Sequence, residues 1–228
     1  MLNIYCRGKY LKGETMNITI IYDNTSINKK LQSDWGFAAF LEINQHKILF
    51  DTGGNGKILL DNMTELDIDP ASINEIFLSH NHYDHTGGLS AFLNQNHNVI
   101  AYSPPSLRGI KNVRKLKYVK EPVELNDGIY STGELEGIEQ SLIVKTSQGL
   151  VVIVGCSHPG VTDILQVAET FGDLYALIGG LHGFDQYEAL ENLELICPTH
   201  CTQNINEIKN RYPDKYLQGG AGTKIKIE

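Results

Sequence analysis

Several kinds of residue and segment are scarce in this chain. Its 228 residues include four cysteines, three methionines and one tryptophan. Four cysteines are too few to form a disulfide framework in a chain of this length, which favours a reducing compartment. No stretch contains the roughly 20 consecutive apolar residues that a membrane span needs, and residues 1–15 lack the apolar segment of a secretory signal. We therefore expect a soluble, cytoplasmic protein without a membrane partner.

Positive charge is also scarce overall, but it is concentrated in one segment. The chain has 19 basic and 27 acidic residues, which gives a formal net charge of −8. This balance argues against broad binding to nucleic acid. Residues 108–120, however, contain Arg108, five further basic residues and no acidic one. Such a run is usually a solvated surface segment. The alternative is an electropositive lip through which Arg108 contacts a phosphorylated substrate.

The length and the apolar pattern predict one domain over residues 1–228, with residues 1–15 as an N-terminal extension. Alternating and β-branched segments predict strands, and apolar residues at helical spacing predict helices, one of them with Thr162 as its N-cap. The expected strands cover residues 18–22, 37–43, 47–50, 76–78, 99–102, 141–146, 149–154, 174–178, 195–197 and 225–227, and the expected helices cover residues 55–63, 89–93, 162–170 and 204–211. Two strand-rich halves, each with helices, indicate two packed sheets covered by helices on their outer faces.

The chain has eight histidines, and three of them lie in one short segment. The predicted strand over residues 76–78 leads directly into His80, His82, Asp84 and His85. Residues two apart in an extended segment project to the same side, so His80 and His82 can bind one ion, while Asp84 and His85 face a neighbouring position. Imidazoles with one carboxylate suit zinc, iron or manganese better than calcium or magnesium. This segment therefore predicts a metal site.

Three further histidines are candidates to complete the site, namely His158, His182 and His200. Each lies just past the carboxyl end of a predicted strand, in a short segment that contains glycine, proline or cysteine. Any one of them alone would be interpreted as a hydrogen-bonded turn residue. Their common placement predicts that they converge on the metal site. The other two histidines lack such a context and are expected at the surface: His46 and His97.

These motifs resemble those of the metallo-β-lactamase-fold superfamily. The hallmark H-x-H-x-D-H is present at residues 80–85, Asp51-Thr52-Gly53 matches the first motif, and His158 and His200 match later ones. The resemblance covers nearly the whole chain and implies an α+β fold, a four-layer αβ/βα sandwich. The segments around His158, His182 and His200 are most similar to the branch that contains dihydropterin-ribofuranosylaminobenzene-phosphate synthase, an enzyme of methanopterin synthesis.

The resemblance also implies a metal centre, with Asp51 as the support of the metal loop. It assigns the ligands of two metal ions: His80, His82 and His158 for the first, and Asp84, His85 and His200 for the second. The superfamily usually has a bridging aspartate at its fourth motif, where this chain has His182. His182 is therefore expected to be an added ligand or an acid/base group that contacts the substrate. One or two zinc ions are expected, with manganese or iron as alternatives.

The activity implied by the resemblance is that of a metal-dependent hydrolase. Metal-activated water would attack a small phosphorylated or pterin-like substrate, and Asp84 would orient or deprotonate that water. Trp35 is a candidate to stack on a flat substrate ring. One alternative is a transferase that joins a dihydropterin methyl diphosphate to an aminobenzene ribofuranosyl phosphate. An alternative of another class is a metal-bound, non-catalytic sensor. The ligands do not distinguish these uses, and the sequence leaves the oligomeric state open.

Overall fold

The computed structural model describes residues 15–228. The expected N-terminal extension, apart from Thr15, lies outside the described residues, as does Cys6. The other three cysteines are buried and form no disulfide: Cys156, Cys197 and Cys201. Within residues 15–228, no helix is long and apolar enough to cross a membrane.

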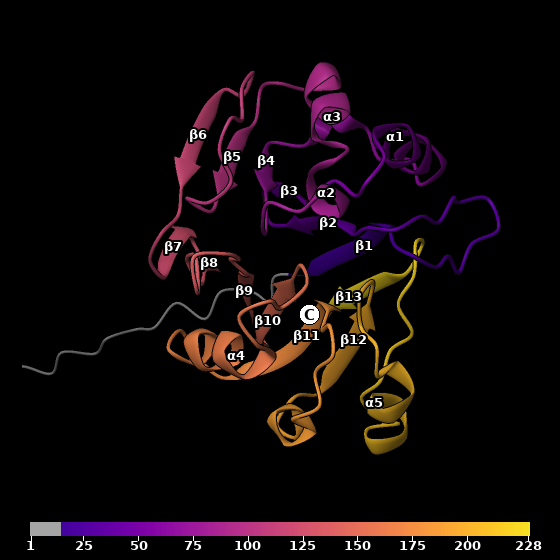
Figure 1. Cartoon of the computed structure of the whole chain (residues 1–228), viewed down its shortest axis with the longest axis vertical. Helices are drawn as coiled ribbons and strands as arrows, with labels where there is room; N and C mark the ends of the chain where they lie inside the picture. The colour runs from indigo at the N-terminus through magenta and orange to yellow at the C-terminus, as the bar shows by residue number, and fades with distance from the viewer. Residues whose placement is uncertain (1–14) are drawn as a thin grey trace, which may run out of the picture.

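The strands form two mixed sheets of seven and six strands (Figure 1). The first sheet has the order β13-β1-β2-β3-β4-β5-β6, with β1 Met16–Tyr22, β2 Ala38–Ile43, β3 His46–Phe50, β4 Glu75–Phe77, β5 Ile100–Ser103, β6 Lys115–Tyr118 and β13 Lys224–Ile227. The second has the order β12-β11-β10-β9-β8-β7, with β7 Val123–Asn126, β8 Ile129–Ser131, β9 Leu142–Thr146, β10 Gly149–Val154, β11 Leu174–Gly180 and β12 Leu195–Thr199. The helices are α1 Gly56–Glu65, α2 Tyr83–Thr86, α3 Leu89–Gln95, α4 Val161–Glu169 and α5 Ile205–Arg211, with short 3-10 helices η1 Pro70–Ser72 and η2 Tyr187–Leu190.

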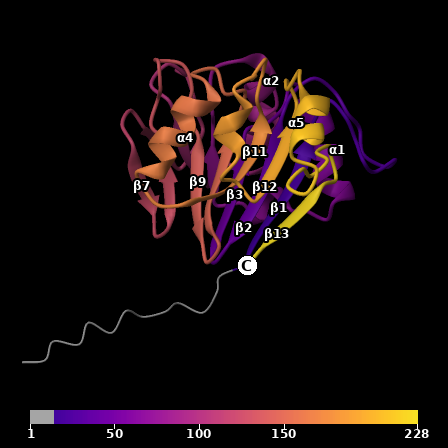
Figure 2. The same cartoon turned by 90° about the horizontal axis from the view of Figure 1, so that it is seen from below.

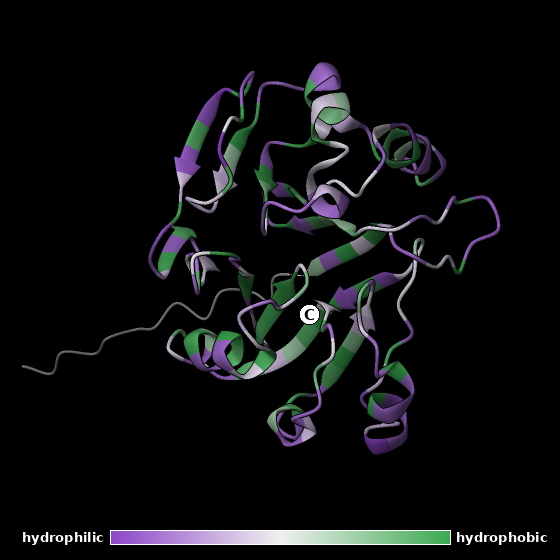
Figure 3. Ribbon diagram, viewed as in Figure 1, coloured by the Kyte–Doolittle hydropathy of each residue, from purple (hydrophilic) through white to green (hydrophobic). Residues whose placement is uncertain are grey.

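Helices cover the outer face of each sheet, so the molecule has four layers (Figures 1 and 2). One apolar core lies between the sheets and includes Phe50 and Ile153. A second core packs α1 and α3 on the first sheet, and a third packs α4 and α5 on the second. The central strands of the second sheet are accordingly apolar, whereas the helices carry polar residues on their exposed side (Figure 3). Each fully buried large apolar side chain stabilises the fold by about 1.5–3 kcal/mol.

The parallel strands direct their carboxyl ends to one edge of the sandwich. In the first sheet β3 runs parallel to β4, and in the second sheet β10, β11 and β12 are mutually parallel. The loops that follow these strands contain Asp51, the segment 80–85, His158, His182 and His200. In open sheets with parallel strands, this is where binding sites form. The topology therefore brings together residues that are far apart in the chain.

The predicted four-layer α+β sandwich is confirmed, and each strand and helix expected from the sequence is present with small shifts at its ends. One local prediction is wrong: Thr162 does not cap α4. Gly160 is the N-cap residue, with a φ of 103° that favours glycine. The hydroxyl of Thr162 instead donates a hydrogen bond to Gln186 Oε1 at 2.9 Å.

The basic segment is part of the first sheet. It contains β6, an edge strand that was not expected and that pairs with β5. Lysines on an edge strand hinder pairing with another chain. The positive charge of this segment can therefore be explained by its place at the edge of the sheet. The guanidinium of Arg108 lies over the Tyr118 ring, 4.5 Å from its centroid. A contact of Arg108 with substrate stays a prediction.

Candidate metal centre

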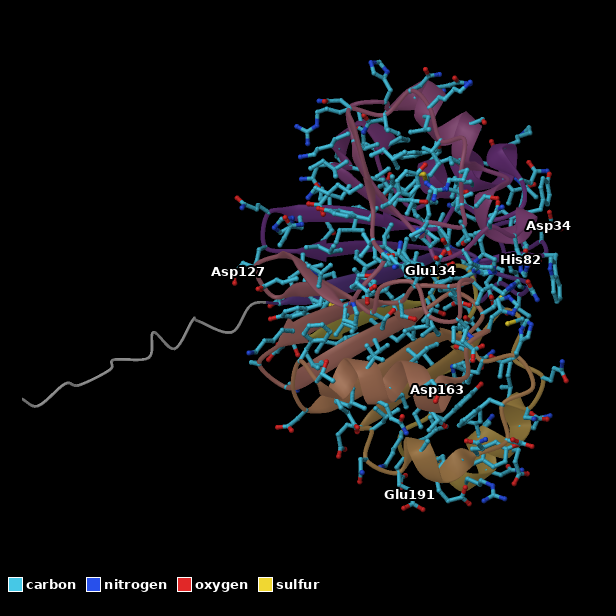
Figure 4. All side chains as sticks on the ribbon, turned by 60° about the vertical axis from the view of Figure 1, so that its left-hand side comes forward. Asp34, His82, Asp127, Glu134, Asp163 and Glu191 are labelled. Carbon is cyan, nitrogen blue, oxygen red and sulfur yellow. The ribbon has the colours of Figure 1, made fainter. Side chains whose placement is uncertain are left out.

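Three histidines from two loops form the first group of possible metal ligands. His82 Nδ1 lies 3.1 Å from His80 Nε2 and 3.1 Å from His158 Nε2. His80 is fully buried, whereas His82 is exposed, and His82 lies at the edge of the molecule opposite Asp127 (Figure 4). Nitrogens bound to one zinc ion at about 2.0–2.1 Å are separated by somewhat more than 3 Å. The three atoms are therefore spaced as ligands of one ion.

A second group lies next to the first and is more deeply buried. Asp84 Oδ2 is 3.1 Å from His200 Nε2 and 3.8 Å from His85 Nε2. The rings of His85 and His80 are 4.2 Å apart between centroids, so the two groups adjoin. The six residues predicted as ligands of two ions are thus brought together in two adjacent sets, here called the first and second donor sets.

Hydrogen bonds to the other ring nitrogen orient three of these histidines. His80 Nδ1 lies 2.8 Å from Ser79 Oγ, His85 Nδ1 lies 2.7 Å from Asp51 Oδ2, and His200 Nδ1 lies 3.0 Å from Asn24 Oδ1. An oxygen partner at Nδ1 fixes the proton there and leaves the lone pair on Nε2. In each case Nε2 is the atom that faces the donor set, which is the tautomer that a metal ligand requires.

Asp51 holds the metal loop, residues 79–85, in place through hydrogen bonds. Its carboxylate accepts hydrogen bonds from the backbone N–H of Ser79 at 2.7 Å, from Ser79 Oγ at 2.6 Å and from His85 Nδ1 at 2.7 Å. Asp51 is fully buried and has a positive φ of 53°. Ser157, His182 and His200 also have positive φ values. Left-handed backbone at non-glycine residues is uncommon and concentrates at functional sites.

Glu139 holds the loop that carries His158. Its Oε1 accepts hydrogen bonds from the backbone N–H groups of Gly155, Cys156 and Ser157 at 3.0–3.1 Å, and Oε2 accepts one from His158 at 2.9 Å. Burial raises the pKa of Glu139, while the N–H donors of His158, Ser157 and Cys156 act in the opposite direction. Because both carboxylate oxygens are acceptors, the arrangement suits the ionised form.

The environment of the first donor set keeps imidazoles neutral. Burial, followed by the proximity of His182 and His82, lowers the pKa of His158 to about 4. Burial and neighbouring imidazoles hold the pKa of His80 far below its usual value. A histidine must be deprotonated on one nitrogen to bind a metal, so these rings are in the binding form at neutral pH.

The second donor set combines the ionised carboxylate of Asp84 with His85, which is paired to a second carboxylate, that of Asp51. Burial alone would raise the pKa of Asp84, but the adjacent His200 and the charge of His85 bring the pKa below its usual range. Burial would lower the pKa of His85, yet the charge and hydrogen bond of Asp51 raise it. A proton on His85 Nε2 would therefore compete with a metal ion at that atom.

One further observation supports the fit of these donor atoms to a metal ion. His200 Nε2 is buried and has no hydrogen-bond partner, although a buried polar atom left unpaired is costly. Its tautomer, fixed by Asn24, leaves a lone pair aimed at Asp84 and His85. A cation at this position would satisfy the nitrogen and the carboxylate together. The residues present therefore fit the metal that the sequence predicts.

A pocket opens beside the first donor set. It has a volume of about 430 Å³, and its wall includes His158, Thr162, His182, Phe184 and Gln186. The ring of His182 lies 4.5 Å from that of His158, and both side chains line the pocket. On another side, the exposed Trp35 ring lies 5.1 Å from His200. Neither this pocket's lining nor any described contact of the donor sets includes Arg108.

Sequence reasoning missed several residues of this centre. Asn24 and Glu139 were not expected there, because only the tertiary fold brings them to His200 and to the loop of His158. The thiol of Cys156, which lies 3.2 Å from His85 Nε2, was not expected there either. The adjacent Cys156-Ser157-His158 segment was the available signal for the cysteine. The expectation for His46 was wrong, because its ring is half-buried and lies 2.6 Å from Glu75. His97 is exposed, as expected.

Two sheets flanked by helices, with a histidine-rich group of possible metal ligands at the carboxyl ends of parallel strands, define an αβ/βα sandwich protein with a candidate metal centre. The sequence profile of the metallo-beta-lactamase superfamily matches residues 36–167, more than half of the chain. The chain belongs to the metallo-beta-lactamase superfamily, as its motifs predicted.

Individual relatives extend over nearly the whole chain. It is 27% identical to the 7,8-dihydropterin-6-methyl-4-(beta-D-ribofuranosyl)-aminobenzene-5'-phosphate synthase of Methanocaldococcus jannaschii, with 92% of this chain and 95% of the relative covered. An uncharacterised protein of the same organism is 29% identical, with 92% and 100% covered. The crystal structure of Tm1679, described as a metal-dependent hydrolase of the beta-lactamase superfamily, superposes with a TM-score of 0.75 at 26% identity and covers 93% of this chain and 99% of that one.

Proposed function

We propose that this protein is a binuclear metal-dependent hydrolase that acts on a small phosphorylated or pterin-like substrate. The observation that carries the proposal is the pair of adjacent donor sets beside a pocket of about 430 Å³. Superfamily membership and the likeness to Tm1679 support metal-dependent chemistry. Bound in the two sets, zinc ions would supply Lewis acidity that activates water and polarises a phosphoryl or carbonyl oxygen.

The chain's own residues have distinct parts in this proposal. Asp84, with its lowered pKa, is ionised, and its carboxylate would accept the proton of the attacking water or orient that water. His182 lines the pocket beside His158 and would give a proton to the leaving group. Trp35, which is 60% exposed, would form an aromatic wall for a flat ring. Asp51 and Glu139 would hold the ligands in place and touch no substrate.

A transferase is the second candidate, and one observation favours it. The relative that is 27% identical over 92% of the chain is named as a synthase of a dihydropterin linked to an aminobenzene ribofuranosyl phosphate. The same donor sets could stabilise a departing diphosphate, while the pocket holds the amine-bearing acceptor. The two candidates share the metal centre and differ in whether water or the acceptor attacks.

One set of measurements separates these functions. Elemental analysis of the purified protein should give two equivalents of metal per chain. The protein is then assayed against a panel of phosphomonoesters, phosphodiesters and cyclic phosphates, and separately with a dihydropterin methyl diphosphate plus the aminobenzene ribofuranosyl phosphate. Hydrolysis supports the first candidate, and condensation supports the second. Tight metal without turnover in either assay would favour a sensor, and a chain that binds no metal would contradict the proposal.

His182 should affect turnover and leave metal binding intact. We expect His182→Ala to retain the metal content of the wild type while kcat falls about a hundredfold, as is typical when an acid/base group is removed. Asp185→Ala is the matched control, because Asp185 lines the same pocket and carries no proposed chemistry. Loss of a metal equivalent in His182→Ala would show that His182 is an added ligand.

A further inference from the structure

The side chain of Cys156 lies between the two donor sets. Its Sγ is within 4.8 Å of the donor atoms of Asp84, His85 and His200, and within 4.8 Å of those of His80 and His158. The distance to His85 Nε2 is 3.2 Å. Cys156 is 2% exposed, so its thiol faces the centre and not solvent. Among the described residues, Cys156 belongs to three clusters of ligand-type side chains whose donor atoms lie within 4.8 Å of one another, one with each donor set and one with His182 and Cys201.

The 3.2 Å distance to His85 Nε2 suits two ligands of one ion, and at most a small shift of the sulfur would bring it within the same reach of His80 and His158. Zinc binds sulfur at about 2.3 Å and nitrogen at about 2.0–2.1 Å, so two ligands of one ion lie within roughly 4.4 Å of each other. His182, which follows β11 where a bridging carboxylate was expected, does not group with either donor set. It groups with Cys156 and Cys201. The space between the sets is therefore taken by a thiol from the loop after β10.

We propose that Cys156 is a ligand of the metal centre and that its single thiolate bridges the two ions. The inference rests on the metal centre of the proposed function. On binding, the S–H bond breaks, sulfur–metal bonds form and the proton is released to solvent. Thiolate is a soft ligand that favours zinc or iron over manganese or magnesium. Cys156 therefore also narrows the choice of metal to zinc or iron.

The surroundings of Cys156 fix its position. Its backbone N–H donates to Glu139 Oε1 at 3.0 Å, within the loop that also places His158. Cys201 packs beside it, with Sγ 3.9 Å from the Cys156 carbonyl oxygen. Gly180 leaves no space behind the pair, because a Cβ at that position would lie 2.7 Å from Cys201 Sγ. Few alternative positions are therefore open to the thiol.

The chain offers two matched control cysteines. Cys201 is buried next to Cys156 but belongs to neither histidine donor set. Cys197 is fully buried in the core between the sheets, where a free cysteine acts as a small apolar residue. If Cys156 were also a packing residue, the three substitutions would have similar effects on the metal centre.

The test uses cobalt(II), which reports sulfur ligation by its absorption. The apoprotein is titrated with cobalt(II), and the visible d–d bands give the amount of bound metal. We expect a near-ultraviolet thiolate-to-cobalt charge-transfer band in the wild type, its loss in Cys156→Ser, and its retention in Cys201→Ala and Cys197→Ala. A band that persists in Cys156→Ser, or is absent from the cobalt-loaded wild type, would overturn the proposal.

X-ray absorption at the zinc edge of the wild type keeps the test independent of variant folding. A sulfur scatterer at about 2.3 Å would support the proposal, and a shell of nitrogen and oxygen alone would overturn it. Failure of the metal centre itself has a different signature. A wild type that binds neither cobalt nor zinc contradicts the proposed function, whereas bound metal without a sulfur ligand contradicts the role of Cys156 alone.

Discussion

His82→Ala is expected to abolish activity, with kcat/KM lower by about 10⁴-fold or more and one metal equivalent lost per chain. His82 Nδ1 is within 3.1 Å of both other nitrogens of the first donor set, so its removal leaves two of the three histidine ligands. A metal ion lowers the pKa of bound water from about 16 to about 7, and this activation is lost with the ion. Elemental analysis and steady-state kinetics on the substrate found by the panel measure the two effects.

His97→Ala is the matched control for this substitution. His97 is also exposed, but it lies in a different pocket with Asn94, Asn98 and Arg114. It should retain full metal and activity. If His82→Ala does the same, the assignment of the first donor set is wrong.

Glu139→Ala is expected to be the most destabilising single substitution among the supports of the centre. It removes the acceptor of four backbone hydrogen bonds from residues 155–158. Each buried N–H left unpaired costs about 1–3 kcal/mol, and entry of water into the cavity would recover part of this. We expect a loss of about 3–5 kcal/mol in the free energy of unfolding, measured by urea denaturation of the metal-free protein.

Two further variants serve as comparisons for the predicted loss of stability in Glu139→Ala. Glu139→Gln keeps one carboxamide oxygen as an acceptor and should lose less stability than Glu139→Ala, with zinc affinity weaker by about 10- to 100-fold. Glu121→Ala removes an exposed carboxylate and should change stability by no more than about 0.5 kcal/mol. A Glu139→Ala protein as stable as Glu121→Ala would show that the loop over residues 155–158 does not depend on this carboxylate.

The metal loop was predictable from sequence because its donors are close together in the chain. His80, His82, Asp84 and His85 lie within six consecutive positions after an apolar strand, so local geometry alone suggests convergence. His158 and His200 were predictable through motif resemblance. Their approach to the loop depends on the packing of two sheets, which no local pattern encodes. The four-layer fold followed from strand-rich halves with amphipathic helices.

The missed residues are those whose environment is created by tertiary structure. Glu139 is an acidic residue in a polar turn by sequence, and it becomes buried when the loop after β10 folds over it. His46 is a turn residue by sequence, but it begins β3 and meets Glu75 from β4. Strand β6 was missed because lysines alternate along an exposed edge, where charge masks the strand pattern. In each case the partner is distant in sequence.

The left-handed backbone at Asp51, Ser157, His182 and His200 has a consequence for metal exchange. Such a conformation costs about 1–2 kcal/mol at a non-glycine residue, so the fold must hold it. Hydrogen bonds that His85 and His200 donate to Asp51 and Asn24 likewise fix the two rings through protein groups. Whereas a zinc finger folds only around its ion, an ion here would enter a preorganised cage. The resident ion could then be exchanged in the native protein, and cellular supply together with ligand preference would decide which metal occupies the centre.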